Sequence, residues 1–518
     1  MVGIGGRSKA CDNCRRRRVK CDQTRPECHK CLRLRLTCGG YPDLTVIQFD
    51  GRRAGKPSQP DPVSADEAAL IPFNSTSSHE SLSLFTAGDE FLLNSEVQLH
   101  PEHIFISFTR SRLLQGPDST NITGVLPRIV DRNLVQKSFL ALATTYFGME
   151  HKEKSLVQRG MQQYGHTLED VHNALSDPSR RTSFDLLQSI TIMGFFEFLV
   201  SENEHGWINH CLGLERLINL RGPASFTNGP ELIVLENARP AIACAALLLH
   251  RSTVFSKSEW KTMPWILYPE RKNCMQSLID ILVDCPELFV MRDRIIAMSV
   301  SDDQASSYRE LFRKTTDLLN QLDQWILTWN QLNPDCYHET VPSNTTPVFT
   351  SSEGRQTPAW TTTIEYDTSI HANNLTLYNA TFILVLKFTY QTALSTDSGL
   401  TDQLQVSELY TKMLAAALMV CRSVDYHLRL MRSGASSFFL WFSLRMAYDA
   451  LGRSNPVIGA WIRNVLQEVH NGNVGRWAIA RYLLDIPPPG NEATSQAESQ
   501  QNAGSPVLWL EGDKWADS

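Results

Sequence analysis

The chain has 518 residues, of which 42% are hydrophobic and 20% charged, a globular balance that excludes a wholly disordered protein and predicts two or more domains. Its net charge of −6 is unevenly distributed: residues 1–56 carry 14 Lys and Arg against 5 Asp and Glu, a net charge of +9, which leaves −15 for the remaining 462 residues. A basic head on an acidic body indicates that the head binds a polyanion.

The sequence predicts neither a secretion signal nor a membrane span. Residues 1–10 contain no apolar segment, and the longest apolar run, Phe184 to Val200, is 17 residues long and includes Asp185 and Glu197. Such a run predicts a buried helix. We therefore expect a soluble intracellular protein. Single cysteines scattered along such a protein are usually buried, reduced thiols. Six cysteines of this chain are scattered in this way, and we expect them to be buried thiols: Cys211, Cys244, Cys274, Cys285, Cys336 and Cys421.

The other six cysteines crowd into the amino terminus in two near-identical halves, Cys-x2-Cys-x6-Cys. They are Cys11, Cys14, Cys21, Cys28, Cys31 and Cys38. Thiolate is the preferred ligand of structural zinc, which takes four ligands. Two zinc ions need eight ligand positions, so six thiolates suffice only if two sulfurs bridge. Because the motif is duplicated, we expect one bridging cysteine from each half, Cys11 and Cys28. The alternative is a module with one zinc ion or a redox role.

Positive charge is concentrated between the second and third cysteines, in the run Arg15, Arg16, Arg17, Arg18 and Lys20. Residues 7–38 carry 11 Lys and Arg against 3 acidic residues, and two zinc ions with six thiolates add −2, so the loaded module has a charge of about +6. Arginine can bind phosphates or pair bidentately with guanine in the major groove. The run therefore predicts a DNA contact. It also fits a nuclear import signal, and one run can serve both roles.

The rest of the chain predicts an all-α body behind a linker. Residues 41–100 are rich in proline and in Ser/Thr, so we assign them to a partly disordered linker that follows the module at residues 1–40. Residues 101–486 form the helical domain, and 487–518 form a polar, acidic tail. One apolar stripe at helical spacing consists of Val157, Met161, Tyr164, Leu168, Val171 and Leu175. A second stripe ends at Gly222-Pro223 and consists of Trp207, Cys211, Leu214 and Ile218.

A third stripe continues for three heptads and contains Tyr308, Phe312, Thr315, Leu319, Leu322, Ile326 and Trp329. It fits either a coiled-coil seam between two chains or one arm of a helical hairpin within one chain. We expect the hairpin, because the pattern is short and includes Thr315.

Several other features are open to a functional interpretation. His210 beside Trp207 fits a ligand-binding or catalytic pair, but a hydrogen-bonded histidine of the core is the better prediction, since no metal-ligand partner stands at a suitable spacing. The tail from Val507 mixes Trp and Leu with Asp and Glu, as activation segments do, or it docks on the body. The sequence lacks GxSxG, HExxH and P-loop motifs, so we expect no enzyme.

The stretch ACDNCRRRRVKCDQTRPECHKCLRLRLTC closely resembles the Zn(II)2Cys6 binuclear cluster of fungal transcription factors. HGWINHCLGLERLINLRGP resembles, more loosely, their helical regulatory domain. The resemblance implies that Cys11 and Cys28 bridge, that Arg17 and Arg18 read a CGG triplet, and that Arg15 and Lys20 contact phosphates. Many members have Lys at the positions of Arg17 and Arg18.

These observations predict a nuclear transcription regulator that binds double-stranded DNA, with the helical body controlling activity through a small molecule or a protein partner. A lone cluster contacts few bases, so we expect a homodimer or a partner factor to supply the remaining affinity. Two other functions stay open at this point. One is a ligand-binding or enzymatic body with incidental DNA binding, and the other is an adaptor whose zinc module binds proteins.

Overall fold

The computed structural model describes residues 101–113, 133–200, 204–298, 302–395, 403–432 and 439–471. Of the amino-terminal segment it describes Cys14, Val19, Cys21, Asp22, Cys28, Cys31, Arg33 and Leu34. The chain divides into two units, Met1–Val97 and Gln98–Ser518. We describe each unit by itself, and call the second unit the helical body.

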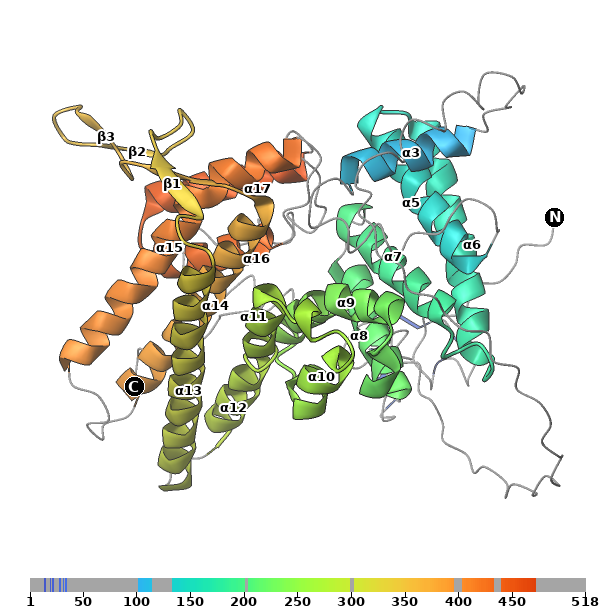
Figure 1. Cartoon of the computed structure of the whole chain (residues 1–518), viewed down its shortest axis with the longest axis horizontal. Coiled ribbons are helices and arrows are strands. Elements are labelled where there is room, and N and C mark those ends of the chain that lie inside the picture. The colour runs from blue at the N-terminus through green and yellow to red at the C-terminus, as the bar shows by residue number, and fades with distance from the viewer. Residues whose placement is uncertain are drawn as a thin grey trace, which may run out of the picture. The chain divides into compact units, whose positions relative to one another are not determined.

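The helical body confirms the all-α prediction (Figure 1). Its first part consists of α3 (Pro101–Leu113), α5 (Leu134–Glu150), α6 (Lys154–Ser176), α7 (Phe184–Val200), α8 (Glu204–Arg221) and α9 (Gly229–Leu248). Next come α10 (Ser258–Thr262), α11 (Cys274–Leu282), α12 (Pro286–Ile296) and α13 (Asp302–Leu332), with 3-10 turns at Pro223–Phe226, Val254–Ser256, Met263–Trp265 and Pro269–Arg271. The last part consists of α14 (Ser369–Ser395), α15 (Gln403–Arg432), α16 (Leu440–Ala447), a π-helical turn (Tyr448–Gly452) and α17 (Pro456–His470).

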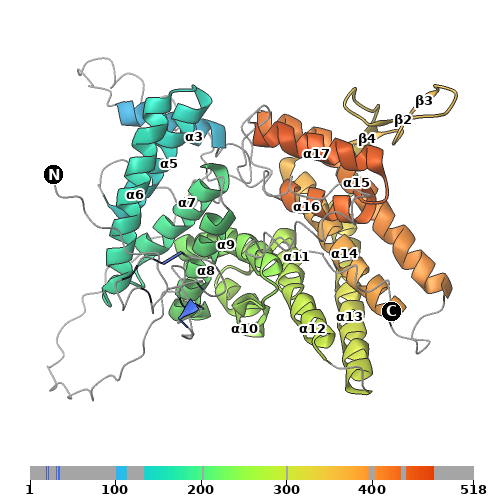
Figure 2. The ribbon, with the colours of Figure 1, turned by 180° about the vertical axis from the view of Figure 1, so that it is seen from behind.

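Many helices that follow one another in sequence pack side by side, among them α5 and α6, α7 and α8, and α14 and α15. One connected apolar core runs from Leu134 in α5 to Val469 in α17. The α5–α6 pair is joined by a short turn, and α3 packs on α5 (Figure 2). Among the described helices, none has a stretch long and apolar enough to cross a lipid bilayer. The run Phe184–Val200 is the buried helix α7, as predicted.

The residues of the first predicted stripe do form a helix, α6. The face that this helix buries, however, is centred on other residues than predicted. Its buried positions are Gly160, Tyr164, Thr167, Val171 and Ala174, whereas Met161 and Leu168 remain 46% and 39% exposed. Small residues carry this seam because α5 and α6 approach closely. Hydrophobic periodicity does not detect such residues, since Gly, Thr and Ala contribute little apolar area.

The stripe on α8 is confirmed, because Trp207, Cys211, Leu214 and Ile218 are all buried. The helix ends where Gly222 adopts φ +77°, a left-handed conformation that glycine reaches without strain, and Pro223 begins the following 3-10 turn.

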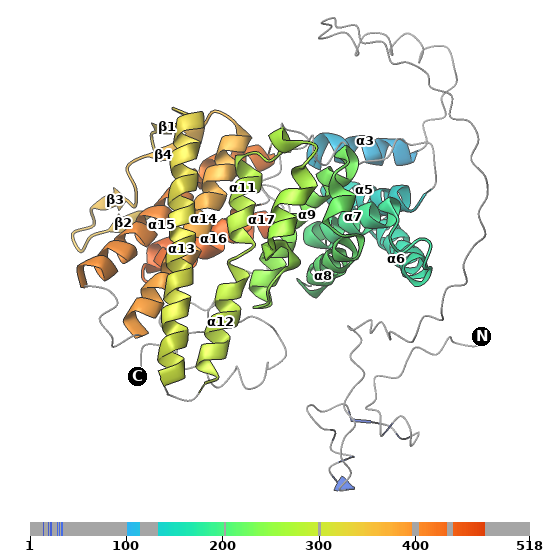
Figure 3. The ribbon, with the colours of Figure 1, turned by 60° about the horizontal axis from the view of Figure 1, so that its bottom comes forward.

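The long helix α13 packs within its own chain on α11, α12 and α14, which confirms the intramolecular alternative (Figure 3). The buried positions are Leu311, Thr315, Leu318, Leu322, Trp325 and Trp329. The predicted Tyr308, Phe312, Leu319 and Ile326 lie at the edge of this stripe and are half-buried. Stacking of Trp325 between Trp329 and Tyr378 of α14, with ring centroids 5.3 Å apart in both pairs, fixes the register of the two helices.

Two small antiparallel pairs of strands between α13 and α14 were not predicted. Strand β1 (Tyr337–Thr340) pairs with β4 (Thr363–Tyr366), and β2 (Val348–Thr350) pairs with β3 (Gln356–Pro358). The side chains of β1, β2 and β3 are mostly exposed, so these strands lack the alternation of apolar and polar residues that reveals a strand in a sequence. Asp425 of α15 accepts hydrogen bonds from Ser343 and Thr345 and anchors the connection between the pairs.

Candidate metal centre and nucleic-acid interface

The described residues of the amino-terminal unit have a core made of sulfur. Cys14, Cys21, Cys28 and Cys31 are buried, with exposed fractions of 2%, 8%, 0% and 1%. The two apolar side chains described there, Val19 and Leu34, are 37% and 52% exposed. Burial of thiols in place of apolar side chains is typical of a short module that folds around a metal.

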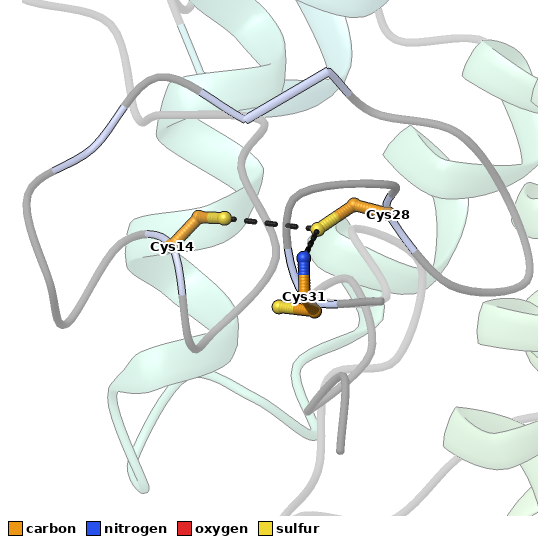
Figure 4. Close-up of side chains that lie close together, drawn as sticks. All are labelled: Cys14, Cys28 and Cys31. Carbon is orange, nitrogen blue, oxygen red and sulfur yellow. Dashed lines mark hydrogen bonds between the residues drawn. The ribbon is translucent and has the colours of Figure 1, made fainter. Parts of the chain in front are cut away.

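The sulfur positions fit zinc ligation and do not fit a disulfide. The Sγ atoms of Cys14 and Cys28 are 3.7 Å apart (Figure 4). A disulfide needs about 2.05 Å. Two thiolates that each lie about 2.3 Å from one tetrahedral zinc ion are about 3.8 Å apart, which matches the separation found here.

Two groups of ligand atoms overlap at one cysteine. Cys14, Cys28 and Cys31 form the first group, and Cys21, Asp22 and Cys28 form the second; within each group the ligand atoms lie within 4.8 Å of one another. Cys28 is therefore the only described residue common to both groups. Membership in both groups makes Cys28 a candidate for a ligand shared by two metal ions.

The turn that joins Cys28 to Cys31 directs a backbone donor at sulfur. The Cys31 amide lies 3.3 Å from Cys28 Sγ (Figure 4). The same amide lies 3.0 Å from the Cys28 carbonyl. A donor pointed at a thiolate stabilises its negative charge and orients its lone pairs. This is the role of the x-x spacing in a Cys-x-x-Cys pair.

The residues that flank the arginine run are hydrogen-bonded to each other. The Val19 amide donates to the Cys14 carbonyl over 3.0 Å, and in the other half the Leu34 amide donates to the Cys31 carbonyl over 3.1 Å. Cys14, Cys31 and Arg33 are helical. Several of the predicted site residues lie outside the described residues, so their assignments stay predictions. They are Cys11, Cys38, Arg15, Arg16, Arg17, Arg18 and Lys20.

Asp22 is a potential ligand that the sequence pattern does not indicate. It is exposed and follows Cys21 directly, so the only available signal was its position next to a cysteine. Six sulfurs, two of them shared, already satisfy the eight ligand positions of two zinc ions, so the sequence gives no reason to expect a carboxylate ligand.

The predicted reading of His210 as a histidine of the core is confirmed. Tyr164 donates its hydroxyl hydrogen to Glu197 Oε1 over 2.6 Å, and its oxygen lies 2.9 Å from His210 Nε2. The hydroxyl has one hydrogen, so Nε2 of a neutral His210 must donate to it. Burial lowers the pKa of His210, although the carboxylate of Glu197 acts in the opposite direction. The network joins α6, α7 and α8.

The cysteines of the helical body are also as predicted. Cys211, Cys244, Cys285, Cys336 and Cys421 are buried free thiols, and Cys274 is half-buried. Burial raises the pKa of Cys421 to about 12, which keeps this thiol protonated and unreactive at neutral pH.

Comparison with known protein families gives two matches along the chain. Residues 9–45 match the Fungal Zn(2)-Cys(6) binuclear cluster domain, and residues 115–417 match the Fungal specific transcription factor domain. A module with a sulfur core followed by such a helical body defines a zinc-cluster transcription regulator. Because the second match covers more than half of the chain, this protein belongs to the fungal-specific transcription factors that carry a Zn(2)-Cys(6) cluster. The cluster domain of this family binds two zinc ions.

Three relatives are similar over parts of the chain. Transcriptional regulatory protein moc3 of Schizosaccharomyces pombe is 32% identical over 23% of this chain and 20% of its own length. Sterol uptake control protein 2 of Saccharomyces cerevisiae is 43% identical over 8% and 6%, and Uncharacterized protein AN5342 of Emericella nidulans is 24% identical over 24% and 26%. The chain thus spans about a quarter or less of the relatives that it matches. No solved structure matches it.

Proposed function

We propose that this protein is a sequence-specific transcription regulator of the nucleus, that its zinc module binds double-stranded DNA, and that it is not an enzyme. The observation that carries the proposal is the buried sulfur core, in which Cys28 belongs to two ligand groups. In this proposal residues 1–40 are the DNA-binding domain, 41–100 the linker, 101–486 the regulatory domain and 487–518 the tail.

Zinc supplies the crosslinks that let so short a segment hold a fixed shape, since structural zinc sites contribute folding free energy directly. We assign six thiolates to two ions, with Cys11 and Cys28 shared. The shared position of Cys28 and the 3.7 Å separation of Cys14 and Cys28 Sγ support this assignment. The other four cysteines, each bound to one ion only, complete the ligand set. They are Cys14, Cys21, Cys31 and Cys38.

The arginine run follows directly on the metal ligand Cys14, so the cluster fixes where the run begins. The hydrogen bond from the Val19 amide to the Cys14 carbonyl ties the residue after the four arginines to the residue before them. We assign guanine contacts in a CGG-like element to Arg17 and Arg18, and phosphate contacts to Arg15 and Lys20. Arg16 adds positive charge, which strengthens binding to any sequence.

The helical body is the regulatory part of the proposal. One connected apolar core joins its helices from α5 to α17. Its control of the DNA-binding module would act through a protein partner or a small effector, and a second copy or a partner factor would supply a second DNA contact.

Selection of bound sites from random duplex DNA by the full-length chain tests the proposal. With zinc present we expect enrichment of sequences that contain CGG, and with a zinc chelator we expect enrichment to disappear. A chain that binds two zinc ions and still selects no sequence would contradict the proposed function. Turnover of a small molecule by the full-length chain would favour an enzyme instead.

A further inference from the structure

The turn that joins α6 to α7 carries a pattern of side chains that the proposed function does not use. Its residues run Arg180, Arg181, Thr182, Ser183 and Phe184, and the order Arg-Arg-x-Ser occurs at no other place in the 518 residues. Protein kinases that act on basic segments bind such arginines through their own carboxylates, and so select the serine that follows. The pattern therefore indicates a serine that a kinase of this kind recognises.

The structure places this pattern at the surface of the helical body. Arg180 and Thr182 are exposed, and Arg181 and Ser183 are half-buried. Local backbone hydrogen bonds hold the turn: the Arg180 and Arg181 amides donate to the Asp177 carbonyl, and the Ser183 amide donates to the Arg180 carbonyl. Surface bonds of this kind open at a small fraction of the free energy of global unfolding. The turn can therefore reach the extended form that a kinase binds.

A comparable segment elsewhere in the helical body is held much more firmly. Arg313, Lys314, Thr315 and Thr316 have the same order of charge, but they lie in the middle of α13. Thr315 is buried, and the Thr316 hydroxyl donates to the Phe312 carbonyl of its own helix. Since a kinase could bind this segment only after the helix unwinds, Thr316 is an internal comparison for Ser183.

Ser183 also lies where a phosphate would be stabilised. Its Oγ accepts a hydrogen bond from the Leu186 amide over 3.3 Å, so it caps the first turn of α7. The first amide groups of a helix have no acceptor within the helix, and together with the helix dipole they favour an anion at this end. The first turn also contains Asp185, which is exposed, so water and salt screen its repulsion.

An arginine of α8 reaches the same turn. The Arg221 guanidinium donates to the Thr182 carbonyl, one residue before Ser183. Its side chain is only 13% exposed, and it lies 3.9 Å from Glu231. Among the described residues, no acceptor binds its Nε. A largely buried guanidinium with an unused donor suits a phosphate, because a phosphate group accepts several hydrogen bonds at once.

We propose that Ser183 is phosphorylated by a kinase that selects arginine at the second and third positions before serine, and that the phosphate pairs with Arg221. In the reaction Ser183 Oγ forms a bond to the γ-phosphorus of a nucleoside triphosphate, and the bond from that phosphorus to the β–γ bridging oxygen breaks. The hydroxyl proton goes to a base of the kinase, and the nucleoside diphosphate leaves. The phosphate then ties the α6–α7 turn to the end of α8. The proposal concerns the helical body alone and does not depend on the proposed DNA binding.

Incubation of the folded full-length chain with Mg-ATP and the catalytic subunit of cyclic-AMP-dependent protein kinase, which prefers Arg-Arg-x-Ser, tests the site. Mass spectrometry of the intact chain and of its peptides follows the phosphate. We expect Ser183 to be modified at least about tenfold faster than Thr316, because its turn opens more readily. Ser183→Ala should remove one phosphate from the intact mass, and the matched control Thr316→Ala should remove none. Modification of Ser183 only after the chain is unfolded in urea, or at the same rate as Thr316, would overturn the proposal.

Thermal unfolding of the phosphorylated chain tests the pairing with Arg221. We expect the phosphate to raise the unfolding temperature by several degrees. Arg221→Gln should abolish most of this gain, whereas Arg216→Gln, at an exposed position of the same helix, should leave the gain unchanged. Each gain is the difference between the phosphorylated and unmodified forms of one variant, so a loss of stability from the substitution itself cancels. No gain in the wild type, or an equal gain in both variants, would refute the pairing.

Discussion

Gly160 of α6 lies against Thr145 of α5 so closely that a Cβ atom on the glycine would come within 2.0 Å of the Thr145 hydroxyl and 2.7 Å of its amide nitrogen. Thr145 Oγ1 donates to the Ala141 carbonyl of its own helix, so the hydroxyl cannot turn away without losing that bond. The close crossing of α5 and α6 therefore requires a residue without a side chain at position 160.

We expect Gly160→Ala to lower the free energy of unfolding by about 1–3 kcal/mol, because the methyl group forces the two backbones apart. Gly165→Ala is the matched control on the same helix, and it should raise the free energy of unfolding by up to about 1 kcal/mol. Urea unfolding of the full-length chain measures both. Equal effects of the two substitutions would mean that the close approach of α5 and α6 is not required.

The network at Tyr164 gives a second prediction about the helical body. Tyr164→Phe removes the hydroxyl that donates to Glu197 and accepts from His210, and it leaves both groups without this partner. We expect a loss of about 1–3 kcal/mol in the free energy of unfolding. Tyr410→Phe is the control, since Tyr410 is 37% exposed on α15. A loss no larger than that of the control would show that the network contributes nothing.

Buried histidines should make the helical body sensitive to acid. His427 is fully buried, with Nε2 2.8 Å from Thr376 Oγ1, and burial lowers its pKa from 6.5 to about 3. The unfolded chain therefore takes up a proton near pH 6.5 that the folded chain does not take up until about pH 3. Stability is complete above pH 6.5 and falls as the pH drops towards 3.

The loss attributable to His427 should reach about 2 kcal/mol by about pH 5. His210 acts in the same direction, because burial lowers its pKa as well. Unfolding measured by denaturant between about pH 7.5 and 5 gives the slope, and His427→Gln should flatten it. A slope that is the same in wild type and variant would rule out His427 as its source.

The sequence predicted the helices well because a 3.6-residue apolar period is a local signal, as α8 and α13 illustrate. It misplaced the seam of α6, since closely approaching backbones select Gly160 and Thr167 over the larger Met161 and Leu168. It also missed the strands near Asp425, whose hydrogen bonds join residues about 80 positions apart and leave no local pattern. The metal centre was predictable because ligand type and spacing are themselves the signal, whereas Asp22 has no such spacing.

The ligand assignment predicts different effects for a shared and an unshared cysteine. Cys28→Ser should reduce the zinc content of the full-length chain from two ions to less than one, because both ions lose a ligand. Cys14→Ser removes a ligand from one ion only and should retain about one. Cys421→Ser, in the core of the body, should retain two. Metal analysis after gel filtration distinguishes these outcomes, and equal zinc losses in Cys28→Ser and Cys14→Ser would contradict the shared role of Cys28.

Substitution of Arg18 should lower the sequence specificity of DNA binding, whereas substitution of Arg15 should lower the affinity for DNA of any sequence. A bidentate contact between arginine and guanine contributes about 1–3 kcal/mol of discrimination, so Arg18→Ala should reduce the preference for CGG over mutated sites by that amount. Arg15→Ala removes a phosphate contact instead. It should weaken binding to all sequences alike and reduce the slope of log affinity against log salt by about one.

Titration of CGG and mutated duplexes by the full-length chain at several salt concentrations measures both effects. Arg180→Ala, an exposed arginine of the body, should change neither. The division of roles depends on position and not on total charge, since Arg15→Ala and Arg18→Ala remove the same charge from the same run. If both substitutions relaxed specificity equally, the run would act as an undivided electrostatic patch, and the guanine contacts would have to come from another part of the module.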